Sequence, residues 1–500
     1  MAYIKSNPHQ TYLIPPKLTD LFSNDHVCYL IEQIANEMDY SEFDYKYAGA
    51  GAPAYHPRIN LKILTLAYID GIKSSRRISK NSQENVVYIY LAEKMQPDFR
   101  TISDFRKDNP KLVKNMFKQI TKFAHREGLI DLNHLMIDGT IIKANANSDK
   151  NIDKKTLDKL DRYIDREIER GIKIDEEEDK LYGDRSFHEL PDDLNDKEKR
   201  SQVVRKIVDE INKAMKEDKK TKVQEIKSEL KEIKQVMEEK GLKKYSVSDS
   251  DSRFMLNKKS KIELSYNAQL VVDKSGLILS NDVVQECDDR NQLLPNVRAV
   301  EKNFGKLPKG TKLSVDNHYS KGKAIIKLDK EGMDIYTPLY GMNKEVKNKF
   351  DKINFLYDEE KDYYVCPEGK LLRKNSTYFH KQRQEELTIY KCGDCRTCPH
   401  QKLCCKSANY RTLIALPQEK LLQRIKAKMQ TPEGKAIYNL RKQTVELGFA
   451  DIKHNRKFRE FLLRGIEKVK TEWDLVCIGS NLVKINNLMK KKRMNLSTGC

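Results

Sequence analysis

The sequence predicts an α/β protein in which a mixed sheet is flanked by helices. Three observations predict this class. Helical spacing of apolar residues prevails up to about residue 130, apolar and β-branched runs follow it, and two of these runs end in an aspartate. The expected parts are a helical domain over 1–130, the first part of the sheet domain over 131–345, a cysteine-rich insertion over 346–418 and a final helical part over 419–500.

The N-terminal region shows apolar residues on single helical faces, and prolines precede its second helix. The face that starts the region is made of Val27, Leu30, Ile31 and Ile34. Basic residues stand at two expected helix ends, among them Arg76 and Arg106. Helices of this kind could lie against DNA, and the same pattern is equally typical of a solvated helical bundle.

The sheet domain is expected to follow the order strand, hairpin, helix and strand. The first strand covers 135–142, and the hairpin pairs 264–272 with 277–284 across a Lys-Ser-Gly turn. A helix over 291–304 precedes the last strand, 311–315. Together these elements predict a mixed sheet covered by helices.

A long charged insertion, at about 150–245, separates the first strand from the hairpin. Its apolar residues recur at steps of three and four, which is a heptad seam, in the set Val223, Ile226, Leu230, Ile233 and Met237 and in the set Leu157, Leu160, Ile164 and Ile168. Pro191 marks a break between the two sets. We expect a helical hairpin or antiparallel coiled coil whose stripe serves packing.

The last part of the chain is predicted to start a helix at Thr431-Pro432-Glu433. A capping hydroxyl, a proline in the first turn and an acid at the positive end of the helix dipole favour this start. We expect this late helix to carry Glu446 and Lys453 on nearly one face. The chain then closes with packed helices and a basic tail over 490–493.

Three acidic residues are the candidate site. Asp138 and Asp316 end strand-like runs, where a carboxylate is costly to bury unless a cation meets it. Glu446 in the late helix supplies a third carboxylate. Such a set is how proteins bind hard divalent cations. For Glu446 alone, an ordinary intrahelical pair with Lys442 would be the simpler explanation.

Composition narrows the class of protein. The chain has 500 residues and a formal net charge of +20, which favours a polyanionic partner such as nucleic acid, unless it only reflects a lysine-rich proteome. No run of about 20 apolar residues predicts a membrane helix. Because the start lacks the apolar core of a secretion signal, we expect a cytoplasmic protein with reduced cysteines.

These residues resemble the DDE superfamily of cut-and-paste insertion-sequence transposases, in the group whose helix signature runs Tyr, Arg, Glu, Lys. Tyr438, Arg441, Glu446 and Lys453 match that signature. Segments in the expected order match the rest of the family: 55–57, 71–76, 97–106, 137–140, 266–269 and 315–319. The similarity touches almost the whole chain apart from the charged insertion.

The resemblance implies a ribonuclease-H-like fold, a synaptic homodimer on paired transposon ends, and double-stranded DNA as both donor and target. It also implies two Mg²⁺ or Mn²⁺ ions, with Asp138 bridging them and Asp316 and Glu446 each completing one. Arg441 and Lys453 would hold phosphates, and Tyr438 would lie near the DNA end. Water attack would nick the DNA, and the freed 3′-hydroxyl would be the next nucleophile.

The sequence departs from the family at three points. His318 precedes Tyr319 where the family usually has glycine, and Leu447-Gly448 follow Glu446 where it often has Pro-Val. The spacing from Arg441 to Glu446 is also one residue longer than in the shortest signature. None of these departures removes a carboxylate.

The second insertion is rich in cysteine. Five cysteines are candidate ligands for a structural zinc ion that would staple a loop-rich segment, with His400 as a spare ligand: Cys366, Cys392, Cys395, Cys398 and Cys404. Cys405 follows directly. The alternative is a set of reduced thiols in a variable insertion.

Two other functions remain open beside a Mg²⁺-dependent transposase. One is a catalytically inactive, transposase-derived protein that binds DNA or regulates. The other is a structure-specific nuclease on the same fold. Of the transposase and the DNA-binding derivative, only the transposase requires the three carboxylates together. Transfer of a cut 3′ end into a second duplex would distinguish the transposase from the nuclease.

Overall fold

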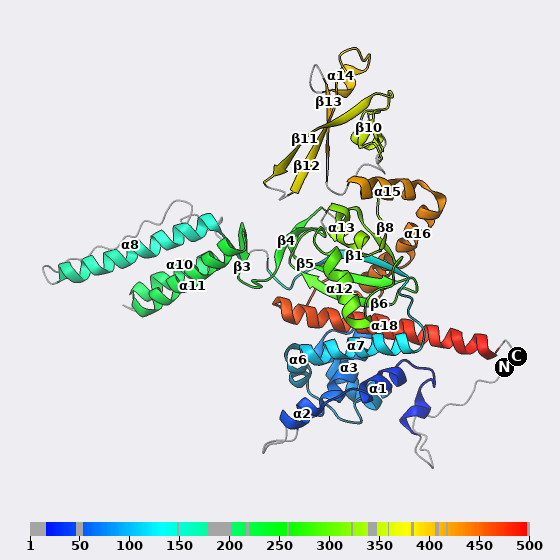
Figure 1. The fold of residues 1–500 in the computed structure, drawn as a ribbon. Coiled ribbons are helices and arrows are strands. Elements are labelled where there is room, and N and C mark those ends of the chain that lie inside the picture. The colour runs from blue at the N-terminus through cyan, green and yellow to red at the C-terminus, as the bar shows by residue number, and fades with distance from the viewer. Residues whose placement is uncertain are drawn as a thin grey trace, which may run out of the picture.

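The fold is described from a computed structural model. It covers residues 17–46, 54–147, 150–178, 202–216, 220–257, 260–321, 324–338, 348–358, 360–381, 385–405, 410–416 and 419–497. Figure 1 shows a body of helices around a sheet, from which a helical arm and a second, smaller sheet project. Among the helices of these ranges, none combines the length and the apolar character that crossing a membrane requires.

The central sheet has the predicted ribonuclease-H-like order. Its strands are β1 (His134–Lys143), β4 (Arg253–Leu256), β5 (Ile262–Asp273), β6 (Ile278–Val284), β7 (Lys312–Val315) and β8 (Asp334–Tyr336). They lie in the order β4-β5-β1-β7-β8, with β6 on the same edge of β5 as β4. β5 runs antiparallel to β1, whereas β7 and β8 run parallel to it. The predicted fold class is therefore confirmed.

The sheet is buried on both faces. Alternate residues of β1 serve different hydrophobic cores: Leu135 and Ile137 belong to one and Met136 to the other. The first core includes residues of α12 (Leu293–Phe304), α13 (Ala324–Lys330) and α15 (Glu419–Gln430). The second includes α18 (Ile466–Ser497) together with the N-terminal helices.

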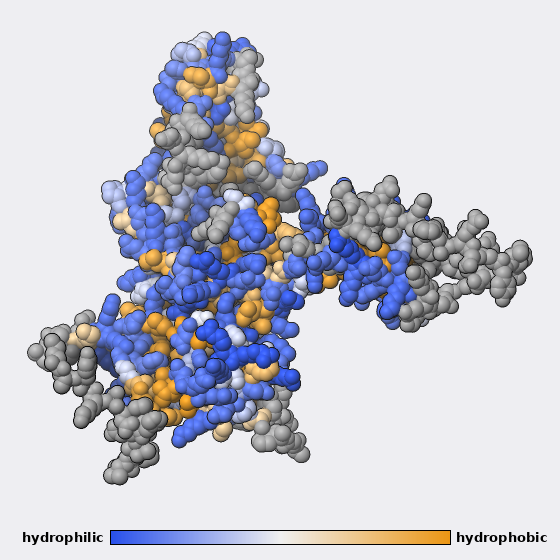
Figure 2. Space-filling view, turned by 180° about the vertical axis from the view of Figure 1, so that it is seen from behind, coloured by the Kyte–Doolittle hydropathy of each residue, from blue (hydrophilic) through white to orange (hydrophobic). Residues whose placement is uncertain are grey.

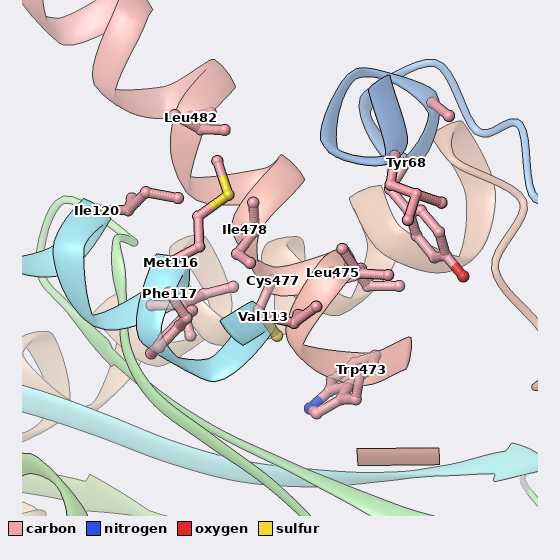
Figure 3. Close-up of a cluster of buried hydrophobic side chains, with 14 of the residues drawn as sticks. Tyr68, Val113, Met116, Phe117, Ile120, Trp473, Leu475, Cys477, Ile478 and Leu482 are labelled. Atoms are coloured by element: carbon pink, nitrogen blue, oxygen red, sulfur yellow. The ribbon is translucent and has the colours of Figure 1, made fainter. Parts of the chain in front are cut away.

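The N-terminal helices share their core with the sheet domain. They are α1 (Cys28–Asn36), α2 (Ser41–Lys46), α3 (Pro57–Ile69), α4 (Ser75–Glu84), α5 (Val86–Leu91), α6 (Phe99–Asp108) and α7 (Pro110–Arg126). Figure 3 shows side chains of α3 and α7 meeting those of α18, with Tyr68, Met116, Phe117 and Ile478 among them. The helix α18 lies between the N-terminal helices and the sheet (Figure 1).

Among its described residues the arm contains three helices, where a helical hairpin or antiparallel coiled coil was expected. A short ribbon of β2 (Asn151–Asp153) and β3 (Lys244–Ser246) closes its base, and α8 (Lys154–Glu178), α10 (Gln202–Lys216) and α11 (Lys220–Glu239) extend from it. The predicted heptad residues Leu160 and Val223 do lie in its core, but Val208 and Ile211 of α10 join them. Pro191 lies outside the described residues. The described helices of the arm thus share a hydrophobic core that is separate from the cores of the central sheet.

The cysteine-rich insertion forms a sheet, so the expectation of a loop-rich segment is wrong. Its antiparallel order is β13-β12-β11-β10-β9. The strands are β9 (Leu356–Asp358), β10 (Tyr363–Val365), β11 (Leu371–His380), β12 (Glu385–Cys392) and β13 (Arg411–Ala415), with a short helix α14 (Gln401–Cys404) before the last. Most of β11 is exposed on both faces, so its sequence lacks the apolar alternation that signals a strand.

The late helix starts as predicted but does not continue to Lys453. The Thr431 hydroxyl accepts a hydrogen bond from the Gly434 amide at 3.0 Å, and Pro432 opens α16 (Pro432–Gln443). At Thr444 the backbone leaves helical geometry (φ −121°, ψ −86°). A second helix, α17 (Val445–Ala450), then passes into a π-helical turn (Asp451–Asn455). The single helix expected here is therefore two.

A buried histidine between β1 and β7, His134, is expected to lower the stability of the protein in acid. The buried His134 ring lies 2.8 Å from the Ser314 hydroxyl, and burial lowers its pKa to about 4. In the unfolded chain the pKa of this histidine is about 6.5, so below pH 6.5 the unfolded chain takes up a proton on His134 that the folded chain does not. The free energy of unfolding therefore falls as the pH drops from 6.5 towards 4. We expect His134 to contribute about 2 kcal/mol of destabilisation at pH 5. Denaturant unfolding at pH 7 and pH 5 should show this loss, and His134→Asn should remove it.

Candidate active site

Strand register places the two aspartates side by side. The parallel pairing of β1 with β7 ends at Ile137 opposite Val315, and Asp138 and Asp316 are the next residues along the two strands. Neighbouring strands lie about 4.8 Å apart, so Asp138 and Asp316 stand at adjacent positions where the pairing of β1 with β7 ends. Both aspartates were expected at strand ends, although β1 continues beyond Asp138 to Lys143.

Arg441 joins two of the three carboxylates. Its Nη2 atom lies 2.6 Å from Oδ1 of Asp138, and its Nη1 atom lies 3.5 Å from Oε1 of Glu446. The guanidinium is buried, whereas the Glu446 side chain is 46% exposed. The break at Thr444 explains this meeting, because five residues on a continuous helix would leave Arg441 and Glu446 on different faces.

Burial dominates the electrostatics of Asp138. It raises the pKa of this carboxyl to about 6, against the opposing effects of Arg441 and of the Gly139 amide, which donates a hydrogen bond at 2.9 Å. The nearby charges of Asp316 and Asp289 raise the pKa further. Asp138 is therefore a carboxylate that depends on cationic partners to stay ionised. Burial likewise raises the pKa of Tyr438, which is close to Arg441.

A polar layer supports β1 next to Asp138; Asn267, Gln269 and Tyr319 lie in segments that match the family, whereas Asp289 was not predicted. The Gln269 amide donates to Asp289 at 2.6 Å and accepts from the Tyr319 hydroxyl at 2.7 Å. Asn267 also donates to Asp289, at 2.8 Å. A Cβ atom at Gly139 would come within 2.3 Å of the Gln269 side chain, so this layer requires glycine beside Asp138. Asp289 follows β6 in a loop and gave no pattern by which it could have been found.

Lys453 lies next to the same strand. Its ammonium donates to the Thr140 hydroxyl at 2.6 Å and to the Ile141 carbonyl at 2.9 Å. The π-helical turn that carries it is thereby tied to β1 just beyond Asp138. Single turns of π-helix occur often at functional sites. Contact of Lys453 with a DNA phosphate stays a prediction.

The two predicted N-terminal contacts occupy different environments. Arg76 is exposed on α4, with its guanidinium 4.1 Å from the centre of the Phe99 ring. Arg106 is buried, and its guanidinium donates to the Lys73 carbonyl at 2.8 Å and to the Tyr68 hydroxyl at 3.4 Å. The expectation that Arg106 contacts DNA is at odds with this position, because the side chain is used to join α3, α4 and α6.

The carboxylates fit a divalent cation by their chemistry. All three supply hard oxygen donors, and Asp138 is a partly buried carboxylate whose ionised form needs positive charge nearby. In the ranges the structure describes, no three His, Cys, Asp or Glu side chains are arranged closely enough to hold a metal ion. Arg441 instead supplies the positive charge between Asp138 and Glu446.

The predicted zinc ligands converge. Cys366, Cys392, Cys395, Cys398 and Cys404 line one pocket of the second sheet, and Cys405 joins them. His400 is not among the lining residues; its ring lies 3.8 Å from Glu368 and packs against Phe350. The remaining described cysteines, Cys28, Cys287 and Cys477, do not line this pocket.

The sheet order and the carboxylates at its centre define a ribonuclease-H-like protein. Comparison with protein families is consistent with this class: residues 365–486 match a family described as transposase DDE domain, and residues 16–108 match one described as transposase domain (DUF772). No curated protein matches the chain. The two family matches support an insertion-sequence DDE transposase, in agreement with the resemblance. The first match includes Arg441, Glu446 and Lys453.

Proposed function

We propose that this transposase binds the terminal inverted repeats of its own insertion sequence, hydrolyses phosphodiester bonds at the ends and transfers the 3′-hydroxyl ends into target DNA. The observation that supports this most is the gathering of carboxylates around one guanidinium. Asp138 and Asp316 stand at adjacent strand positions, and Glu446 reaches Arg441 from α17. A protein that only binds DNA has no need of this arrangement.

Asp138, Asp316 and Glu446 are the residues that would hold the divalent cations, two Mg²⁺ or Mn²⁺ ions. Such cations activate water at one side of a phosphodiester and stabilise the leaving oxygen at the other. Burial raises the pKa of Asp138 to about 6, so a cation would stabilise the ionised form of this carboxylate. The polar layer of Gln269 and Asp289 would keep β1, and with it Asp138, in place during the reaction.

Arg441 would change partner during the reaction. Its planar donors suit a phosphate as well as a carboxylate, so it can leave Glu446 for the DNA backbone. Tyr438 lies beside it and would contact the DNA end, and Lys453 would add a point charge near Thr140. These side chains bind and orient the scissile phosphate against Asp138.

Exposed basic side chains outside the active site would bind the DNA backbone. The net charge is +20, and the face seen in Figure 2 is mostly hydrophilic. The exposed Arg76 on α4 is one candidate phosphate contact. Because two element ends must be brought together, we propose that a homodimer forms the synaptic complex, acting on DNA in the bacterial cytoplasm.

The test is cleavage of a labelled duplex that carries the element's own ends. With Mg²⁺ the wild-type protein should produce 3′-hydroxyl nicks at the element boundary, and EDTA should abolish them. Glu446→Gln should lower the cleavage rate by about 10²–10³-fold, because it removes a carboxylate but keeps the side-chain shape. DNA binding, measured by gel shift, should persist in the variant.

Glu467→Gln is the matched control, since it removes an exposed carboxylate at the start of α18. It should cleave like the wild type. Equal DNA binding with no cleavage by any of the proteins would instead identify a DNA-binding derivative. Cleavage without transfer of the 3′ end into a second duplex would identify a nuclease.

A further inference from the structure

Six thiols from three separate segments meet in the second sheet, and the proposed transposition chemistry uses none of them. Cys366 lies in the turn after β10, three cysteines lie in the turn that begins at the end of β12, and Cys404 and Cys405 lie at the end of α14. All six line one pocket, together with Phe350, Phe355 and Arg411. Within the described ranges every cysteine is a free thiol.

The turn at Cys366 is built to present its sulfur. The Lys370 amide donates to Sγ of Cys366 at 3.2 Å, while the Cys366 amide donates to the Lys370 carbonyl at 2.8 Å. Gly369 supports the turn with φ at +76°. This N–H···S hydrogen bond fixes the position of the Cys366 sulfur at the pocket.

A positive side chain faces the same pocket. Arg411 donates to the Cys404 carbonyl at 2.7 Å and to the Phe350 carbonyl at 3.2 Å. Its Nε atom is buried and finds no hydrogen-bond partner among the described residues. Buried N–H groups nearly always have an acceptor, so an acceptor in the pocket would satisfy this atom. Thiolates bound to a cation would supply that acceptor.

The second sheet has little else to hold it together. Its core contains Phe355, Tyr364, Leu372, Tyr390, Leu413 and Ala415, and its other buried members are the cysteines Cys392 and Cys395. Small domains with so few buried apolar side chains usually need a cross-link or a metal.

We propose that this pocket binds one structural Zn²⁺ ion through four thiolates. One comes from Cys366, two come from the turn Cys392–Cys398, and one comes from the pair Cys404–Cys405. All-sulfur, four-coordinate sites are typical of structural zinc. Each ligating thiol gives its proton to solvent as it binds. The thiols line one pocket, although among the described residues they do not stand in a closed ligand shell.

The proposal is tested on the full chain, purified without chelator and analysed by metal mass spectrometry. The wild type should carry about one zinc per chain, and Cys366→Ser should lose it. Cys287→Ser is the matched control, because Cys287 is exposed and outside the second sheet; it should keep its zinc. Of the six single Cys→Ser variants, four should lose the metal and two should keep it.

A second measurement does not depend on the folding of a variant. Wild-type protein loaded with Co²⁺ in place of Zn²⁺ should show thiolate-to-cobalt charge-transfer absorption, and zinc should protect four thiols from alkylation. Less than about 0.1 zinc per wild-type chain, iron in its place, or retention of zinc by Cys366→Ser would overturn the proposal. None of these readouts involves DNA cleavage, so the outcome is independent of the proposed function.

Discussion

Replacing Asp138 by asparagine is expected to lower the rate of cleavage at the element ends by about 10³-fold. The amide keeps the shape of the side chain but has no charge with which to hold a cation. Asp138 is also the carboxylate with the closest ion pair to Arg441, at 2.6 Å, and Asp316 and Glu446 are further acidic neighbours of that guanidinium. Single-turnover cleavage of an end duplex at saturating protein measures the effect.

Asp138→Asn also removes the negative charge that is paired with the buried Arg441 guanidinium. Arg441 would keep Glu446 at 3.5 Å as an acidic neighbour, so we expect a loss of about 1–3 kcal/mol in the free energy of unfolding. Asp282→Asn is the control, because Asp282 lies on β6 with its side chain 45% exposed and pairs with Lys470. A cleavage rate in Asp138→Asn within tenfold of the control would contradict the assignment of the site.

Truncation of Trp473 to alanine is expected to lower the free energy of unfolding by about 3–5 kcal/mol. The ring is fully buried at the start of α18, packed against Phe449, Phe458 and Phe461 (Figure 3 shows its position on the helix). Its Nε1 atom donates to the Gln269 carbonyl at 3.3 Å. Urea unfolding, followed by circular dichroism, measures the loss.

Trp473→Phe separates packing from hydrogen bonding. It keeps most of the ring but removes the donor to Gln269, so a loss of about 1–2 kcal/mol is expected. Because Gln269 also carries the bonds to Asp289 and Tyr319 behind β1, this variant should slow cleavage more than its stability loss explains. If Trp473→Ala and Trp473→Phe lowered the free energy of unfolding equally, packing around the ring would contribute nothing beyond the hydrogen bond.

The sheet and two of its carboxylates could be predicted because their signals are local. The runs before Asp138 and Asp316 are apolar and β-branched, and each strand of the hairpin over 264–284 lies within two residues of its expected bounds. Parallel pairing of β1 with β7 then follows from the fold class. The register that sets Asp138 beside Asp316 is a consequence of that pairing.

The remaining features depend on contacts between distant segments. The sequence around Thr444 has no proline or glycine to announce a break, and the break is where Arg441 turns towards Asp138. The burial of Arg106 depends on Tyr68 and on Glu472, 366 residues away. In the second sheet, exposed strands such as β11 pair along their backbones, which leaves no apolar period in the sequence.

The position of α18 sets an order for folding during synthesis. Tyr68 near the beginning of the chain donates to Glu472 on α18, 404 residues later, and both side chains are buried. The apolar faces of α3 and α7 therefore stay uncovered while the ribosome makes the sheet, the arm and the second sheet. A nascent chain that stops before residue 466 would expose them to solvent and to other chains. The hydrophobic core of the N-terminal helices can therefore be completed only after α18 has been translated.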